Sequence, residues 1–293
     1  MEEGERPGAQ GGGTKAPVRD DRVLPTTRAV SVVIVPVLTA AFVILFLFPG
    51  QTRTLWGWTI RSRMTAMFMG GGYLAGALFF ARAWQSREWH RIGPGIVAVT
   101  LFAGMLGATT FLHWSEFNHG HVSFWAWTLL YLTTPLLLPV LYLRNRAHDP
   151  GPPGQDEVPV PTWIRSTLTV MGAAQLLFAL ALFLRPSLFL AHWPWNLTTL
   201  SARSLAAFAA FPAVTYLAFA VEPRWSALRW PFETAIAGVA LIAVGAARSS
   251  GNFHSGNLAW AWRAGLVGAL VFLVGVRLAM RRPPAAAPLP SGG

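Results

Sequence analysis

The sequence predicts an all-α integral membrane protein with eight transmembrane helices. It further predicts two parallel four-helix repeats, related by a pseudo-twofold axis along the membrane normal. Three observations support this fold class. The 293-residue chain is 53% hydrophobic and only 12% charged, whereas soluble domains carry about 25% charged residues. Eight apolar runs approach the length of about 20 residues that a span requires. Finally, a set of aromatic motifs occurs twice in the same order.

The internal repeat is carried mainly by tryptophan. The matched elements are Phe46-Leu47-x-Pro49 with Phe183-Leu184-x-Pro186, Trp56-x-Trp58 with Trp193-x-Trp195, Trp84 and Trp89 with Trp225 and Trp230, and Trp125-Ala126-Trp127 with Trp260-Ala261-Trp262. The offsets between matched motifs lie between 135 and 141 residues, so the two copies differ in length only by short insertions. Four spans per copy make the copies parallel, because an even number of crossings restores the chain direction.

The apolar runs divide the chain into two halves. The predicted spans are 29–48, 64–83, 94–113, 122–143, 166–184, 204–221, 231–247 and 258–280. The first repeat therefore covers 29–143 and the second 163–280, with a polar, proline-rich linker at 144–162. Residues 1–28 and 281–293 are rich in glycine, proline and charge, and we expect disordered tails there.

The net charge of +11 reflects membrane topology rather than nucleic-acid binding. The basic residues lie at the ends of apolar runs, and no nucleic-acid-binding motif is present. With the N-terminus inside, 16 Lys and Arg residues fall on the inner side and 7 on the outer side, which favours cytoplasmic termini. Only Lys15 among the 23 basic residues is lysine. This bias is typical of a GC-rich bacterial genome, so we expect the inner membrane of a bacterium.

The repeated Trp-x-Trp pairs are the first candidate functional residues. Trp56 and Trp58 precede the second span, and Trp193 and Trp195 precede the sixth. Tryptophan collects at membrane interfaces because its ring is apolar while its N–H needs a polar partner. We therefore interpret these residues as interfacial anchors. The alternative is an aromatic-lined binding cleft on the outer face.

An arginine follows each pair, namely Arg63 in the first half and Arg203 in the second. Arginine at a helix N-terminus is mildly unfavourable on its own, so its repetition suggests an anion nearby. That anion is a lipid phosphate or an acidic side chain, unless the arginines simply extend to lipid headgroups. Together with the four tryptophans, these arginines form the predicted lipid- or anion-binding set.

One cluster of potential metal ligands occurs in the first half only. His113, Glu116, His119 and His121 follow the third span, and the corresponding stretch of the second half does not repeat them. Histidine and carboxylate ligands suit Zn, Fe or Mn. The competing interpretation is a solvated polar loop without any cofactor. Cysteine is absent, so thiol chemistry and cysteine-ligated metals are excluded.

Small residues four positions apart occur in the second and sixth spans. Gly72 and Gly76 have counterparts in Ala206 and Ala210. Such pairs allow close helix packing within one chain, or a dimer seam between chains.

These patterns favour a non-catalytic membrane protein that binds lipid or serves as a subunit of a membrane complex. No span carries Asp, Glu or Lys near its middle, and no P-loop or nucleophile motif is present. The expected partners are membrane lipids and, for a subunit of a complex, another membrane protein. Two alternatives remain: a transporter for a small apolar or anionic molecule, and a metal-dependent enzyme that uses the histidine cluster.

Overall fold

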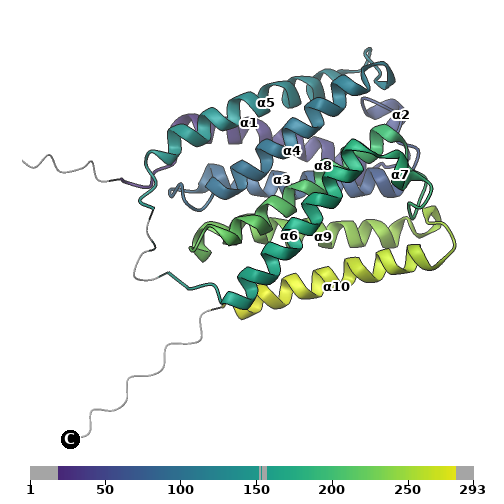
Figure 1. Ribbon diagram of the computed structural model, residues 1–293. Helices are drawn as coiled ribbons and strands as arrows, with labels where there is room; N and C mark the ends of the chain where they lie inside the picture. The colour runs from purple at the N-terminus through teal and green to yellow at the C-terminus, as the bar shows by residue number, and fades with distance from the viewer. Residues whose placement is uncertain (1–18, 152, 154–156, 282–293) are drawn as a thin grey trace, which may run out of the picture.

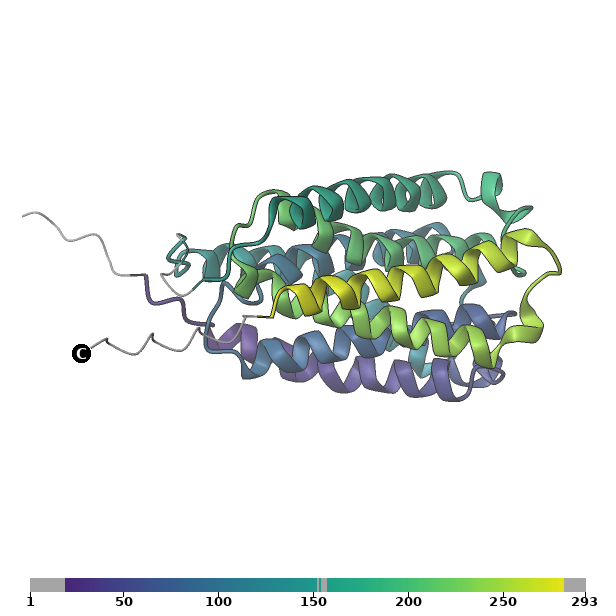
Figure 2. The same cartoon turned by 90° about the horizontal axis from the view of Figure 1, so that it is seen from below.

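The computed structural model describes residues 19–151, 153 and 157–281. These residues form a helical bundle, in which the only β-type contacts are three isolated bridges. Among them, eight helices are long and apolar enough to cross a membrane. The described chain begins and ends at the same end of the bundle, called here the terminal end, and the short helices α2 and α7 lie at the opposite end (Figures 1 and 2).

The described residues form α-helices and a few short helical turns. In chain order they are α1 (Pro25–Phe42), the π-helical turn η1 (Val43–Leu47), α2 (Thr52–Leu55), α3 (Arg63–Gln85), α4 (Gly93–Leu112), the 3-10 turn η2 (Trp114–Glu116), α5 (Val122–Arg146), α6 (Thr162–Leu184), α7 (Ser187–Leu190), α8 (Thr199–Leu217), η3 (Ala218–Ala220), α9 (Trp225–Arg248), η4 (Ser250–Asn252) and α10 (Asn257–Ala279).

The eight predicted spans are confirmed as helices, with boundaries that differ by a few residues. The largest difference is at α9, which begins at Trp225 rather than at the predicted Pro231. Pro231 lies inside this helix. A proline removes one backbone hydrogen bond, but membrane helices tolerate it because neighbouring groups satisfy the freed carbonyl.

The predicted N-terminal tail is wrong for residues 19–28. Pro25 opens α1, where a missing N–H costs nothing. Before it, the Asp21 N–H donates to the His148 carbonyl at 2.9 Å, and the Leu24 N–H donates to the Asn145 side chain at 2.9 Å. This segment thus packs onto the bundle. The tails predicted at 1–18 and 282–293 lie outside the described residues.

The helix contacts occur in matching pairs. Within the halves, the α1–α3 contact corresponds to the α6–α8 contact, and the α4–α5 contact corresponds to the α9–α10 contact. Between the halves, the α3–α9 contact corresponds to the α8–α4 contact. The centre of the bundle is formed by α3, α4 and α8, while α6 and α10 leave most of their apolar side chains exposed. Contacts between the two halves therefore run through the middle of the bundle, chiefly from α3 to α9 and from α4 to α8.

Glycine permits the closest approaches between helices. A Cβ atom on Gly72 would lie 2.3 Å from the Phe208 ring of α8. The small residue at this position thus accommodates a partner within the same chain, which favours packing over a dimer seam. Similarly, a Cβ atom on Gly172 of α6 would lie 2.8 Å from the Ala213 carbonyl oxygen of α8.

Replacing Gly172 by alanine is expected to separate α6 from α8. Because the nearest atoms belong to backbone, relief requires movement of a helix, and we expect a loss of about 1–3 kcal/mol in unfolding free energy. Gly268→Ala in α10 is the matched control, since nothing lies within 4 Å of the added atom. The control should be neutral or slightly stabilising. Thermal unfolding in detergent compares the two, and equal melting temperatures would contradict the proposed contact.

Candidate functional site

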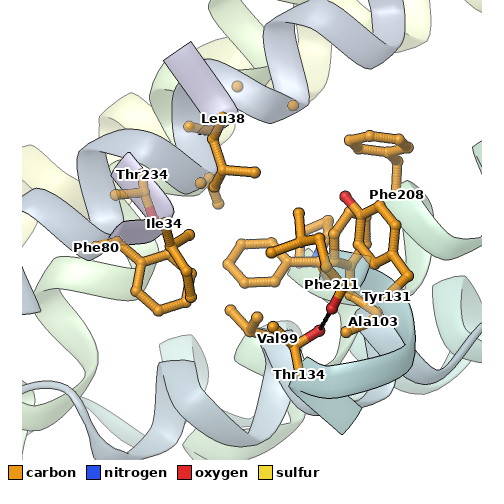
Figure 3. A pocket seen from close by; sticks show the side chains of 18 of the residues that line it. Ile34, Leu38, Phe80, Val99, Ala103, Tyr131, Thr134, Phe208, Phe211 and Thr234 are labelled. Carbon is orange, nitrogen blue, oxygen red and sulfur yellow. Dashed lines mark hydrogen bonds between the residues drawn. The ribbon is translucent and has the colours of Figure 1, made fainter. Parts of the chain in front are cut away.

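A cavity lies between the two halves of the bundle, near the middle of the long helices. Its volume is about 90 Å³. Helices α1, α3, α4 and α5 line it from the first half, and α8 and α9 from the second. Figure 3 shows Ile34, Leu38 and Phe80 on one side, with Tyr131, Phe208 and Phe211 on the other. The lining is nearly all apolar.

The few polar groups at the cavity already have partners. Thr134 donates its hydroxyl to the Leu130 carbonyl at 2.6 Å, and Thr234 donates to the Pro231 carbonyl at 2.8 Å. The Tyr131 hydroxyl donates to the hydroxyl of Tyr73 at 3.1 Å. No charged residue is among the lining residues. This chemistry suits an apolar occupant, because an ion would find no compensating charge there.

Each half contains an aromatic cluster, and both clusters lie toward the end of the bundle that is opposite the terminal end. In the first half, the Trp58 ring centroid lies 5.1 Å from Phe117 and 4.9 Å from Trp127. In the second half, Trp195 lies 5.3 Å from Phe253 and 5.0 Å from Trp262. Trp56 and Trp193 pack against Trp58 and Trp195, respectively, at 5.7 and 5.4 Å. The tryptophans of both Trp-x-Trp pairs therefore belong to packed aromatic clusters, in which most ring pairs have the edge-to-face geometry typical of aromatic cores.

Three of the four tryptophans in the Trp-x-Trp pairs are not exposed as interfacial anchors would be. Trp56, Trp58 and Trp195 are buried, with 5%, 4% and 0% of their surface exposed. The Trp195 N–H donates to the Thr65 hydroxyl at 2.8 Å, so its polar atom is satisfied inside the protein. Residues such as Trp260 and Trp84, which are 69% and 49% exposed, are better placed for anchoring.

The two predicted arginines have different surroundings. Arg203 donates to the Phe183 carbonyl at 3.1 Å and to His113 Nε2 at 2.6 Å. Arg63 is exposed, and its guanidinium lies beside Gly50. The sequence predicted either a lipid phosphate or an acidic side chain near these arginines. Arg203 is connected to the acidic side chain of Glu116 through His113, because His113 Nδ1 lies 2.5 Å from Glu116 Oε1.

This Arg203–His113–Glu116 chain fixes the tautomer of the histidine. Arginine can only donate, so His113 Nε2 accepts and Nδ1 carries the proton that bonds to Glu116. Both ring nitrogens are thereby used, and His113 is only 6% exposed. The chain joins α8 to the end of α4, and hence one half of the protein to the other. All three residues were candidates from the sequence, and His113 and Glu116 were in one predicted cluster, but nothing in the sequence placed Arg203 beside them.

The other two predicted metal ligands bond elsewhere. His119 Nε2 donates to the Trp114 carbonyl at 3.0 Å. His121 Nε2 donates to the Thr54 carbonyl at 2.8 Å, while its Nδ1 accepts from the Ser123 N–H and caps α5. Among the described residues, the one group of three potential ligands within 4.8 Å is instead Asp21, Glu88 and His90.

A polar network at the terminal end was not predicted from the sequence. Arg224 is 6% exposed and bonds to Asp149 at 2.8 and 3.2 Å and to Glu222 at 2.7 and 2.9 Å. These contacts tie the linker to the start of α9. The pKa of Arg224 is raised, first by the hydrogen bonds to Glu222 and then by those to Asp149, against the opposing effect of burial.

A second series of contacts at the terminal end joins an aspartate, a histidine and a serine, as in a hydrolytic triad, but the serine is not activated. The Asp21 carboxylate contacts His90 Nδ1, and His90 Nε2 lies 3.0 Å from Ser226 Oγ. However, the Ser226 hydroxyl donates to Glu157 at 2.7 Å. Its proton therefore points away from the imidazole, which cannot act as its general base in this geometry. These contacts instead join the N-terminal segment, the α3–α4 loop, the linker and α9.

The Arg224–Asp149 contact predicts a pH-dependent contribution to stability. Burial raises the pKa of Asp149, but hydrogen bonds from Arg224 and from the Gly151 N–H outweigh it and hold the pKa below its ordinary value. Asp149 thus stabilises the fold fully above the ordinary pKa of about 3.9, and this contribution is lost as the pH falls through the lowered value.

Melting curves of the wild type and Asp149→Asn from pH 3 to pH 8 measure this contribution. We expect a constant difference in melting temperature at neutral pH that shrinks below about pH 4. A difference that persists unchanged at pH 3 would contradict the assignment to the Asp149 charge.

Comparison with known proteins gives no further assignment. No family model matches the chain, and no curated protein or solved structure is significantly similar to it.

Proposed function

We propose that this chain is a non-catalytic multi-pass membrane protein that binds a small apolar molecule, or the end of a lipid acyl chain, between its two halves. The cavity lined by α1, α3, α4, α5, α8 and α9 is the observation that carries this proposal. Apolar cavities of about 150 Å³ take up molecules such as benzene. A cavity of about 90 Å³ accommodates a few methylene groups rather than a whole lipid.

The architecture we propose is two parallel four-helix repeats about a pseudo-twofold axis, with both termini in the cytoplasm of a bacterial inner membrane. The paired helix contacts and the two aromatic clusters support the repeat. On this arrangement the cavity lies next to the axis, where the halves meet. The excess of arginine on one side of the spans supports the orientation.

Single introduced cysteines test this orientation cleanly, because the chain has none of its own. Ala147→Cys lies at the terminal end and Gly251→Cys at the opposite end, and both positions are exposed. In intact spheroplasts, a membrane-impermeant maleimide should label Gly251→Cys alone. After lysis it should label both. The reverse pattern would place the termini outside.

Photocrosslinking tests the binding function directly. The probe is a phospholipid with a diazirine at the end of one acyl chain, added to the purified protein. We expect crosslinks on peptides that contain Val99, Ala103 and Thr234, and their loss when leucine fills the cavity in Ala103→Leu or Ala235→Leu. Ala261→Leu on the exposed side of α10 is the matched control. Crosslinks confined to α6 and α10, unchanged by the filling variants, would refute the proposal.

A transporter for a small apolar molecule is the second candidate, because the cavity receives residues from both halves. Its lining offers no charge to an anionic substrate. The test is the flux of a small apolar dye analogue across proteoliposomes. Flux that exceeds that of empty liposomes, and that Ala235→Leu abolishes, would favour transport over static binding.

The metal-dependent enzyme is supported least, since His113, His119 and His121 have separate partners. Elemental analysis for Zn, Fe and Mn decides it.

A further inference from the structure

A polar groove lies at the terminal end, beside the end of α3. Its volume is about 250 Å³. Three arginines, Arg82, Arg87 and Arg91, line it together with Glu88 and Trp230. Trp230 belongs to α9 and the other residues to α3 and the loop after it. The groove is separate from the apolar cavity and from the histidines at the opposite end.

The charges in this groove do not cancel. Arg91 is paired with Glu88, the one carboxylate of the lining. Arg82 lies over the Trp230 ring, 4.1 Å from its centroid. Within the described part of the chain, neither Arg82 nor Arg87 has an acidic partner within 4 Å. Two guanidinium groups therefore remain available, and one of them is oriented by an aromatic face.

This charge balance selects an anion over a metal ion. Asp21, Glu88 and His90 lie close enough to hold a cation. However, Asp21 bonds to His90 and Glu88 bonds to Arg91, so these side chains already have partners within the protein. A cation entering the groove would also meet Arg82 and Arg87. Guanidinium groups present paired N–H donors that match the oxygens of a phosphate group.

The position of the groove relates that anion to the membrane. Helix α3 ends at Gln85, so the groove lies where a span meets the headgroup layer. The neighbouring Trp84 is 49% exposed, as in an aromatic belt. We propose that the groove binds the phosphate of an anionic phospholipid through Arg82 and Arg87. This site is independent of the apolar ligand proposed for the cavity.

Native mass spectrometry of the full-length protein, titrated with phosphatidylglycerol or phosphatidylcholine, tests this site. The variants are Arg82→Gln, Arg87→Gln and the double variant. Arg53→Gln is the control, because Arg53 is exposed at the opposite end. We expect the wild type to prefer phosphatidylglycerol, and each groove substitution to weaken that binding about fivefold. Among the described residues the Arg87 side chain makes no ion pair, so Arg87→Gln keeps the test valid if Arg82→Gln unfolds.

Several outcomes would overturn the site. Unchanged phosphatidylglycerol binding in the double variant would exclude Arg82 and Arg87. Equal binding of the two lipids by the wild type would exclude a preference for anionic headgroups. Displacement of the lipid by millimolar inorganic phosphate would assign the groove to a soluble anion. Ala235→Leu should leave the titration unchanged, so failure of the cavity proposal and failure of this one are distinguishable.

Discussion

Replacing Trp195 by alanine is expected to lower the free energy of unfolding by about 3–5 kcal/mol, the range found when a buried aromatic ring is removed. Trp195 is fully buried, and its ring packs on Trp193, Phe253 and Trp262. Its N–H also donates to Thr65 in the first half of the protein. The substitution therefore leaves a cavity, deprives a buried hydroxyl of its partner and weakens the contact between the halves.

The tryptophan pair of α10 supplies a matched control. Trp260 is 69% exposed, whereas Trp262 packs against Trp195. Trp260→Ala should change stability by less than about 0.5 kcal/mol. Trp195→Phe should fall between the two, because it keeps a ring but removes the donor to Thr65. Unfolding in mixed micelles with increasing dodecyl sulfate measures all three. Equal losses for Trp195→Ala and Trp260→Ala would show that burial does not determine the role of these tryptophans.

The positions of the spans could be predicted because they depend only on local composition. A lipid environment requires about 20 apolar residues in a helix that satisfies its own backbone. That requirement is visible in runs such as 94–113 and 122–143, which match α4 and α5 closely. The start of α9 was missed because Trp225 to Trp230 contain polar residues, which read as a loop although they are helical.

The direction of the tryptophans could not be predicted, because a residue type does not specify which way its side chain points. Two partners of Trp195, Phe253 and Trp262, lie more than fifty residues further along the chain. Only the packing of α8, α9 and α10 brings them together. One sequence signal pointed the right way: the interval between Phe117 and Phe253 falls within the range of offsets between the matched tryptophan motifs. Phe117 packs on Trp58, and Phe253 packs on Trp195.

The polar networks were missed for the same reason. Arg203 and His113 are 90 residues apart, and Arg224 and Asp149 are 75 apart. Asp149 lies in a proline-rich stretch that indicated a solvated linker. In the structure it accepts two hydrogen bonds from Arg224 and one from the Gly151 N–H. A linker with a buried partner is thus part of the fold, which composition alone does not reveal.

Replacing Arg224 by glutamine is the other change with a large expected effect. Arg224 holds two carboxylates, Asp149 and Glu222, which are themselves only 19% and 15% exposed. Removing the cation leaves two like charges together in a half-buried site, and breaking such a pair by removing one partner costs about 3–5 kcal/mol. We expect the loss at the upper part of that range at neutral pH, with a smaller loss at a pH low enough to protonate Asp149.

Arg229, near the start of α9, provides the matched control for Arg224, which directly precedes that helix. It pairs with Glu233 at 3.0 Å but is 43% exposed, so Arg229→Gln should cost at most about 1 kcal/mol. Arg224→Lys keeps the charge but loses the fork that bonds both carboxylates, and should recover only part of the stability. Adding Asp149→Asn to Arg224→Gln removes one of the stranded charges and should restore some stability. If that second change instead adds its full separate cost, the two residues do not interact, and the linker is not held to α9 through this contact.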